Sequence, residues 1–419
     1  MDHSQRTGNT GISDTGFSRR SFLQWTGSAA ALAAATALPA GRAYSAETGK
    51  TLRMGVVGGG FGATFHWHQH PNCKITGVTD LREDRRIRLR ERYQCDAVYD
   101  SLETMIREAD DIDAVAVFSG ATDHVKHTKM CFERGWHVVA ACPACVTVEE
   151  AHELKELKEQ TGLRYMMAES SYYRMEAIFV RNLYDSGAMG EIYYSEGDYY
   201  HDRGDLERLV TNTASRFYMP DGSRSWRWGL PPMLYPTHSL CFLTGITGER
   251  VTKVSALGWG TKDHPYLTDN AYDNPFWNES ALMYTDRGHM HRCNVFWLVA
   301  DHGERAQWYG DAAAVFMPSV GINNSTVKKR RTEEERPATD TVEVPQYWRD
   351  SPMLPETMRH SSGHGGSAVF LSAEFVNALL EDREPAIDVY ESLAMTVPGI
   401  VAHQSALKDG EQLPVPQFD

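Results

Sequence analysis

Apolar and charged segments alternate along the first part of the chain. Short apolar runs predict buried strands at 51–57, 74–79, 113–118, 136–140 and 164–168. Charged or amphipathic segments between them predict helices at 64–70, 81–93, 101–108, 128–134 and 148–161. Strands that alternate with helices predict an α/β domain with a doubly wound parallel sheet, whose ligand crevice lies at the carboxyl ends of the strands.

The turn after the first strand carries a dinucleotide-binding fingerprint. Residues 58–63 read Gly-Gly-Gly-Phe-Gly-Ala, a G-x-G-x-x-A pattern between a predicted strand and a predicted helix. Asp80 follows Gly58 by 22 residues, the spacing at which a carboxylate meets the adenosine ribose. Asp80 favours NAD because its charge would repel a 2′-phosphate, and Arg82 leaves NADP open. The residues expected to contact the cofactor are Gly58, Gly60, Phe61, Gly62, Asp80, Arg82, Ser119, Thr122, His124, His127 and Cys142.

The second half of the chain has a different pattern. Alternating apolar and polar positions between 252 and 308 predict the strands of an open sheet. The polar, proline-interrupted segment 321–361 predicts a surface excursion, and 367–380 predicts an amphipathic helix. A last helical region at 388–408, interrupted at Pro398 and Gly399, is expected to pack back near the first domain. We therefore expect a cofactor domain at 46–168 and an α+β domain at 169–419.

The first 45 residues resemble a targeting segment. Arg19 and Arg20 form a twin-arginine pattern, and a mildly apolar run and small residues follow it. The run is too short and too rich in alanine to predict a membrane span. The pattern predicts export of a folded, cofactor-loaded protein by the twin-arginine route to the periplasm or another extracytoplasmic space.

Charge and cysteine usage narrow the function classes. A formal net charge of −14 makes the surface unfavourable for nucleic acids or anionic membranes. Seven cysteines at irregular spacing do not indicate a disulfide framework. Cys142 and Cys145 form a C-x-x-C pattern, which either is a redox pair or fills space at a strand end. No set of residues is nominated as metal ligands.

From residue 51 onward the chain resembles the Gfo/Idh/MocA oxidoreductases. The resemblance rests on the glycine turn and on the sequences at 122–127, 135–138, 147–151 and 185–192. It implies an N-terminal Rossmann domain, then a large open, mostly antiparallel sheet that carries a sugar site and pairs subunits into a homo-oligomer. The family usually has Glu-Lys-Pro where this chain has Ala141-Cys142-Pro143, so a thiol stands at the position of the usual catalytic lysine. Acid–base chemistry is therefore expected from other residues.

A branch of that family resembles this chain more specifically. The NAD-dependent glycosidases typified by α-N-acetylgalactosaminidases share the motifs at 166–169, 199–202 and 235–238. The resemblance implies four catalytic residues around the sugar, namely Glu169, Tyr199, Tyr235 and His238. The residues expected to bind the substrate are Tyr172, His201, Trp226, Arg227 and His364. Ser239 replaces the glycine usual after the last motif, which leaves the pocket shape and the sugar open.

Three functions remain open from the sequence. The first is redox-neutral glycoside cleavage, in which hydride abstraction from a sugar ring carbon, elimination, water addition and re-reduction follow one another. The second is a net sugar dehydrogenase that releases an oxidised sugar. The third is a non-catalytic sugar sensor that keeps the cofactor. In the first, His238 and Tyr235 are expected to handle the hydroxyl proton and Tyr199 the neighbouring C–H proton.

Overall fold

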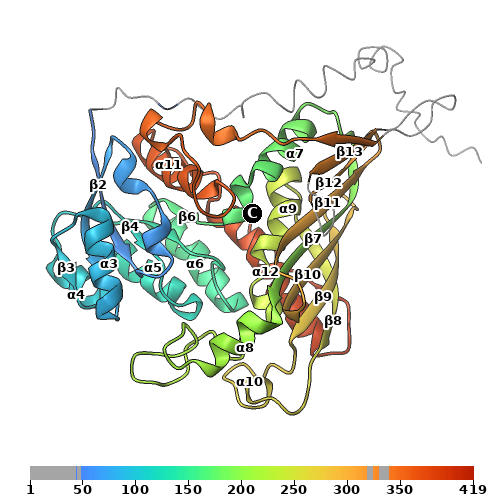
Figure 1. Cartoon of the computed structure of the whole chain (residues 1–419), viewed down its shortest axis with the longest axis horizontal. Coiled ribbons are helices and arrows are strands. Elements are labelled where there is room, and N and C mark those ends of the chain that lie inside the picture. The colour runs from blue at the N-terminus through green and yellow to red at the C-terminus, as the bar shows by residue number, and fades with distance from the viewer. Residues whose placement is uncertain (1–43, 45–48, 319–323, 330–338) are drawn as a thin grey trace, which may run out of the picture.

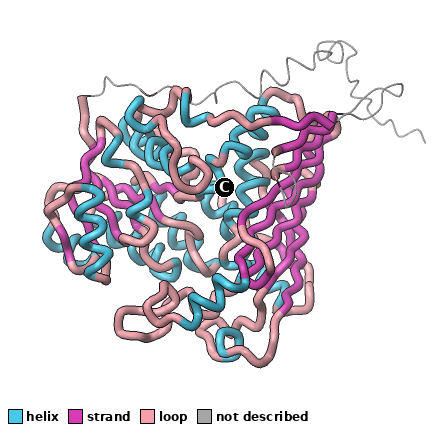
Figure 2. The backbone as a smooth tube through the Cα atoms, viewed as in Figure 1, coloured by secondary structure: helices cyan, strands magenta, loops and turns pink. Residues whose placement is uncertain are grey.

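Six parallel strands form the first sheet, as the alternating pattern predicts (Figures 1 and 2). The computed structural model describes residue 44 and residues 49–318, 324–329 and 339–419, so the predicted twin-arginine pattern lies outside the described residues. The sheet has the order β3-β2-β1-β4-β5-β6 and consists of β1 (Leu52–Val57), β2 (Cys73–Thr79), β3 (Val98–Tyr99), β4 (Ala114–Val117), β5 (His137–Ala140) and β6 (Tyr165–Met167). The order reverses between β1 and β4, so the ligand crevice is expected beside the ends of these two strands.

Helices cover both faces of this sheet in the doubly wound manner (Figure 1). They are α3 (Glu83–Tyr93), α4 (Leu102–Glu108), α5 (His124–Glu133) and α6 (Val148–Thr161). The expected helix at 64–70 is wrong. Two short 3-10 helices, η2 (Gly62–Thr64) and η3 (Trp67–Gln69), flank an extended Phe65. The rings of Phe65 and Trp67 are buried and stack with centroids 4.7 Å apart, so aromatic packing overrides helical spacing here.

Nine strands form the second sheet, which is mostly antiparallel as expected. Its order is β14-β13-β12-β11-β7-β10-β9-β8-β15. Among the described strands of this second sheet, only β10 and β7 pair in parallel. The strands are β7 (Ile192–Asp202), β8 (Val251–Trp259), β9 (Asn278–Thr285), β10 (Met290–Val299), β11 (Gly303–Gly310), β12 (Ala313–Phe316), β13 (Ser325–Lys329), β14 (Thr339–Val342) and β15 (Leu413–Pro414). Its layer lies opposite the first domain in Figure 1.

One face of the second sheet packs against helices that lie between the two sheets (Figure 1). The helices of this half are α7 (Met175–Asp185), α8 (Arg203–Thr211), α9 (Thr237–Thr247), α10 (Pro265–Thr268), α11 (Ser367–Leu380) and α12 (Val389–Ala406). The 3-10 turns are η4 (Ala121–Asp123), η5 (Ser170–Tyr173), η6 (Pro232–Leu234), η7 (Tyr347–Arg349) and η8 (Glu356–Met358). Helix α9 contacts β7, β10 and β11, and α12 contacts β8. No helix among the described residues is both long and apolar enough to cross a membrane.

Two expectations for the C-terminal half need correction. The segment 321–361 is not simply a surface excursion, because β13 and β14 extend the sheet and Tyr347 and Leu354 are buried. Residues 321–323 and 330–338 of that segment lie outside the described part. The predicted interruption at Pro398 is also wrong, since α12 is continuous. A Cβ on Gly399 would lie 2.3 Å from the Met233 carbonyl oxygen, so this glycine allows the close packing of α12 on η6.

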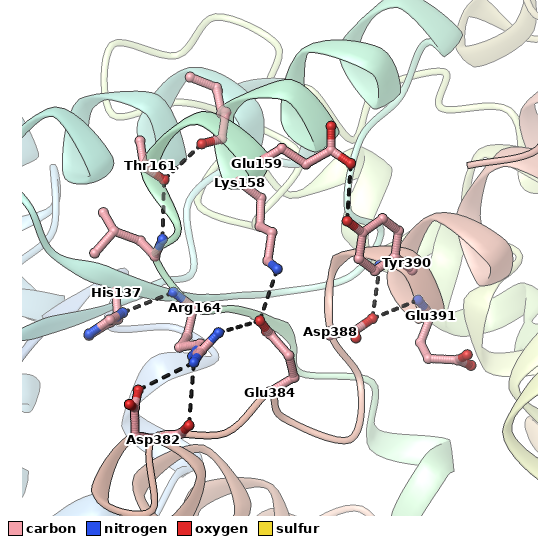
Figure 3. Close-up of polar contacts among 12 residues, drawn as sticks. His137, Lys158, Glu159, Thr161, Arg164, Asp382, Glu384, Asp388, Tyr390 and Glu391 are labelled. Atoms are coloured by element: carbon pink, nitrogen blue, oxygen red, sulfur yellow. Dashed lines mark hydrogen bonds and ion pairs between the residues drawn. The ribbon is translucent and has the colours of Figure 1, made fainter. Parts of the chain in front are cut away.

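Ion pairs join α6 and β6 to the segment between α11 and α12 (Figure 3). Lys158 donates to Glu384 at 2.9 Å, and Arg164 contacts both Glu384 and Asp382. Tyr390, in the first turn of α12, donates to Glu159 on α6 at 3.1 Å. Shared partners reduce the entropy cost of each pair, so this network holds the two domains more firmly than isolated surface pairs would.

Candidate active site

A cavity of about 740 Å³ opens where the carboxyl ends of the first sheet face the second domain. Most of the predicted site residues line this cavity. The predicted residues that line it are Gly58, Gly60, Phe61, Asp80, Arg82, Ser119, His124, His127, Cys142, Tyr199, His201, Trp226, Arg227, Tyr235, His238 and His364. Nucleotide-binding and sugar-binding candidates thus share a single space.

The glycine turn shapes the cofactor end of the cavity. Gly58 has a φ of +97°, and a Cβ there would lie 2.2 Å from the carbonyl oxygen of Phe118 after β4. A Cβ on Gly60 would approach only the Arg85 guanidinium, at 3.6 Å, so this residue faces open space. The carboxylate of Asp80 is buried and accepts hydrogen bonds from the backbone N–H groups of Gly59 (2.7 Å) and Arg82 (2.8 Å). These features fit a dinucleotide whose phosphates approach bare backbone and whose ribose meets a fixed carboxylate.

His124 supports the wall next to the glycine turn. Burial lowers its pKa to about 4, so the ring is neutral, and its Nδ1 donates to the Pro143 carbonyl oxygen at 2.8 Å. Its Nε2 has no hydrogen-bond partner among the described residues. His127 contacts the Ser119 hydroxyl at 2.8 Å. The His124 contact therefore joins the segment after β4 to the segment after β5.

His238 and Glu169 form a buried pair beside the cavity. Glu169 follows β6 and caps η5, and His238 lies in the first turn of α9, where Pro236 and the preceding turn start the helix. His238 Nδ1 donates to Glu169 Oε1 at 2.6 Å. Burial would raise the pKa of Glu169, but the charge of His238 and the hydrogen bonds from His238, Thr237 and the Ser171 N–H together outweigh burial and lower that pKa to about 2. Burial opposes protonation of His238, yet Glu169 raises its pKa well above the ordinary value.

Two tyrosines lie against His238. The Tyr199 ring, on β7, is centred 4.5 Å from the His238 ring, and the Tyr235 ring is centred 5.4 Å from it. The Tyr199 hydroxyl lies 2.8 Å from Nε2 of His201, whose pKa falls to about 3 on burial, so this imidazole is neutral. Burial raises the pKa of Tyr199, while the charge of His238 lowers it. The site therefore holds two proton-handling pairs, Glu169–His238 and His201–Tyr199.

Cys142 reaches this cluster from the end of β5. Its Sγ lies 3.7 Å from the Tyr235 hydroxyl and 3.9 Å from Nε2 of His238. Potential ligand atoms of Cys142, Glu169 and His238 lie within 4.8 Å of one another. However, Glu169 contacts Nδ1 of His238 while Cys142 faces Nε2, so one ion at Nε2 would not also take the Glu169 contact. All seven cysteines are free and buried.

Comparisons with known proteins match two separate parts of the chain. The family model "Oxidoreductase family, NAD-binding Rossmann fold" (Gfo/Idh/MocA) matches residues 52–169, and the model "Glycosyl hydrolase 109, C-terminal domain" matches residues 315–419. The chain therefore resembles NAD-binding oxidoreductases over its first domain and glycosyl hydrolase 109 proteins over its C-terminal part. It is an NAD-dependent enzyme of the glycosidase or dehydrogenase type.

Individual proteins are similar to longer parts of the chain. A glycosyl hydrolase family 109 protein of Streptomyces coelicolor is 25% identical over 411 residues, covering 88% of this chain and 83% of its own. An α-N-acetylgalactosaminidase of Bacteroides fragilis is 34% identical over 166 residues, 36% of either chain. Levoglucosan dehydrogenase in complex with NADH and levoglucosan has a TM-score of 0.70 at 16% identity, covering 88% of this chain and all of that one. That structural likeness shows the shared fold.

Some of the predicted site residues do not reach the cavity. Tyr172 turns its ring onto the Arg181 guanidinium, 4.0 Å away, and packs on Gly245, so it is not brought to the sugar end. Gly62, Thr122 and Glu169 also lie outside the cavity lining, but Glu169 contacts His238, which lines it, at 2.6 Å. One face of Trp226 is covered by Arg227 at 4.3 Å.

The sequence did not single out three residues that the fold brings to the site. Trp297 lines the cavity, and its ring lies 6.1 Å from that of Tyr199. The Ser171 hydroxyl lies 3.2 Å from Nδ1 of His238 and donates to Glu304 at 2.6 Å. Arg216 lines the cavity from the loop after α8. Trp297 stands in an alternating pattern that is typical of any strand, so nothing in the sequence marks it as a site residue. Neither Ser171 nor Arg216 belongs to a recognisable motif.

Proposed function

We propose that the enzyme cleaves glycosides in a redox-neutral cycle on a tightly held NAD. Bound NAD supplies a hydride acceptor for the sugar ring carbon and the same hydride for its final reduction. The observation that carries the proposal is the presence of two separately held acid–base pairs, Glu169–His238 and His201–Tyr199, in a single cavity with a glycine turn. Alcohol oxidation needs one base, and elimination needs a second.

His238 and Tyr199 divide the proton transfers. His238 Nε2 takes the hydroxyl proton when the ring is neutral, the form that prevails above its pKa, with Glu169 holding Nδ1–H and Tyr235 orienting the oxygen. The ring carbon becomes a ketone, which acidifies the adjacent C–H. Tyr199 accepts that proton as its own hydroxyl proton passes to Nε2 of His201, the glycosidic C–O bond breaks, and the aglycone takes a proton from solvent. Water then adds to the anomeric carbon, the adjacent carbon regains a proton, and the ketone is reduced.

Product analysis tests this proposal against net oxidation. We expect aryl glycosides to release the aglycone and the free sugar at its original oxidation level, with no accumulation of NADH. If the enzyme instead produced stoichiometric oxidised sugar and left the glycosidic bonds intact, a net sugar dehydrogenase would replace this proposal. Bound nicotinamide whose spectrum does not respond to any sugar would favour the non-catalytic sensor.

Glu169→Gln should move the acid limb of the kcat/KM profile to lower pH. His238 must be neutral to accept a proton, so activity is present above its pKa and lost below it. Glu169 raises that pKa, and an uncharged amide removes the effect. We also expect the maximal rate to fall at least about tenfold, because the imidazole loses its orienting partner. An acid limb that stays in place or moves to higher pH would contradict the pairing.

Cys142→Ala should leave kcat/KM within about tenfold of the wild type, since sulfur contacts at 3.7 and 3.9 Å contribute little. The thiol cannot reproduce the charge of a lysine ammonium. Rates measured with and without dithiothreitol check the redox alternative for Cys142 and Cys145. A loss of more than about a thousandfold, or activity that follows the reductant, would make the thiol catalytic.

We also propose export and self-association. The twin-arginine pattern supports export of the loaded protein to the periplasm or another extracytoplasmic space. The face of the second sheet away from the helices exposes Leu257, Trp259, Leu282 and Tyr284, which supports pairing of two subunits there. Cell fractionation and light scattering measure these two properties.

A further inference from the structure

Two guanidinium groups at the sugar end of the cavity have no acidic partner among the residues that the structure describes. Arg216 and Arg227 both line the cavity, and neither side chain forms an ion pair or a hydrogen bond with any residue in the described ranges. Arg227 stacks on Trp226, with its guanidinium 4.3 Å from the ring centroid. Arg216 remains accessible to solvent, although surrounding protein, together with the positive charge of Arg227, lowers its pKa. Such groups are available to a ligand.

The nearby carboxylates are already engaged by other cations. Glu169 pairs with His238 at 2.6 Å. Glu304 accepts two hydrogen bonds from Arg174, at 2.6 and 2.7 Å. Each of these acids is thereby compensated locally. A protein of net charge −14 thus keeps unpaired positive charge at the sugar end of its cavity.

Asp205, on α8, acts electrostatically on Arg216, but its carboxylate already forms an ion pair with Arg208 at 2.9 Å. The other groups that act electrostatically on Arg216 are Tyr199 and Tyr235, which belong to the catalytic cluster. The phosphates of a dinucleotide are expected instead at the glycine turn, where Gly60 and Arg85 face the cavity. Arg216 therefore belongs to the sugar end.

We propose that the substrate is an acidic sugar, whose sulfate or carboxylate group is held by Arg216 and Arg227. Guanidinium groups bind planar or tetrahedral oxyanions through paired N–H donors, so two arginines in one cavity with no acidic partner among the described residues suit such a ligand. The inference rests on the proposed glycoside cleavage and names its substrate class.

Matched pairs of aryl glycosides test the inference. Each pair consists of a neutral sugar and the same sugar as its 6-sulfate or uronic acid. We expect the wild type to prefer the anionic member by at least about tenfold in kcat/KM. Arg216→Gln should remove most of this preference, chiefly through a higher KM for the anionic member. Arg208→Gln, a change of the same kind on the exposed side of α8, should retain the preference.

Binding and cofactor content separate the alternatives. Thermal unfolding with the free acidic sugar, with the neutral sugar and with inorganic sulfate reports binding without turnover. Stabilisation by the acidic sugar that Arg216→Gln abolishes supports the inference even if no glycoside is cleaved, in which case only the proposed function fails. A wild-type preference for the neutral member, or an Arg216→Gln protein that loses NAD and keeps its sugar preference, would overturn it.

Discussion

Replacing His238 by glutamine is expected to lower kcat/KM by roughly a thousandfold or more while the protein still carries NAD. The imidazole provides the base that faces the hydroxyl oxygen, and a glutamine amide cannot accept a proton at neutral pH. Its N–H₂ group can still meet Glu169, whose carboxyl is expected to become protonated once the buried cation is removed. Rates on an aryl glycoside, the NAD content of the denatured supernatant and thermal unfolding measure the three parts of this expectation.

His403 offers a matched control. It lies on α12, its Nδ1 contacts Glu279 at 2.8 Å, and the pair is as buried as His238 and Glu169, but it does not line the cavity. His403→Gln should therefore reduce stability without a comparable loss of kcat/KM. If His238→Gln kept wild-type rates, or if both variants lost activity only in proportion to lost stability, His238 would have a structural role.

Gly60→Val should abolish retention of NAD through gel filtration. The Cβ position of Gly60 meets only the Arg85 guanidinium at 3.6 Å, so the valine can be accommodated by the protein but occupies the approach of the pyrophosphate. We expect at least about a tenfold loss of bound nicotinamide with little change in the folded structure. Cofactor released by denaturation is assayed from fresh preparations of both proteins.

A graded variant separates steric exclusion from unfolding. Gly60→Ala adds a single methyl group and should retain more NAD than Gly60→Val, whereas circular dichroism should be the same for both. Gly58→Ala should instead unfold the turn, because its Cβ would lie 2.2 Å from a backbone oxygen at a positive φ. Full retention of NAD by Gly60→Val would show that the cofactor does not approach this glycine.

Local patterns were sufficient to predict most of the fold. The glycine turn and the alternation of strands and helices are set by residues close together in the sequence, so they can be recognised without the fold. Helices such as 148–161 and 367–380 have the predicted bounds. The pattern failed at Phe65 and Trp67, where burial of aromatic rings replaced a helix by two short turns. It also failed for β13 and β14, because a polar edge strand resembles a loop until its partner strand is known.

The site was predictable only as far as its motifs extend. Tyr199, Tyr235 and His238 each stand in a short motif, and the fold brings them together. Arg216 carries no such signal, because only the folded cavity shows that its guanidinium has no acidic partner among the described residues. Tyr172 fails for the opposite reason: it neighbours Glu169 and Ser171 in the chain, but its ring points to Arg181.

Hydrogen exchange at the sugar during turnover tests the central proposal most directly. The enzyme is incubated with an aryl glycoside in deuterated water, and the released sugar is analysed by NMR and mass spectrometry. Elimination through a ketone requires that the carbon next to the anomeric centre lose its proton and regain one from solvent. The proposal predicts deuterium at that carbon, stoichiometric aglycone and no net NADH. Aglycone release with no deuterium at that carbon would contradict it.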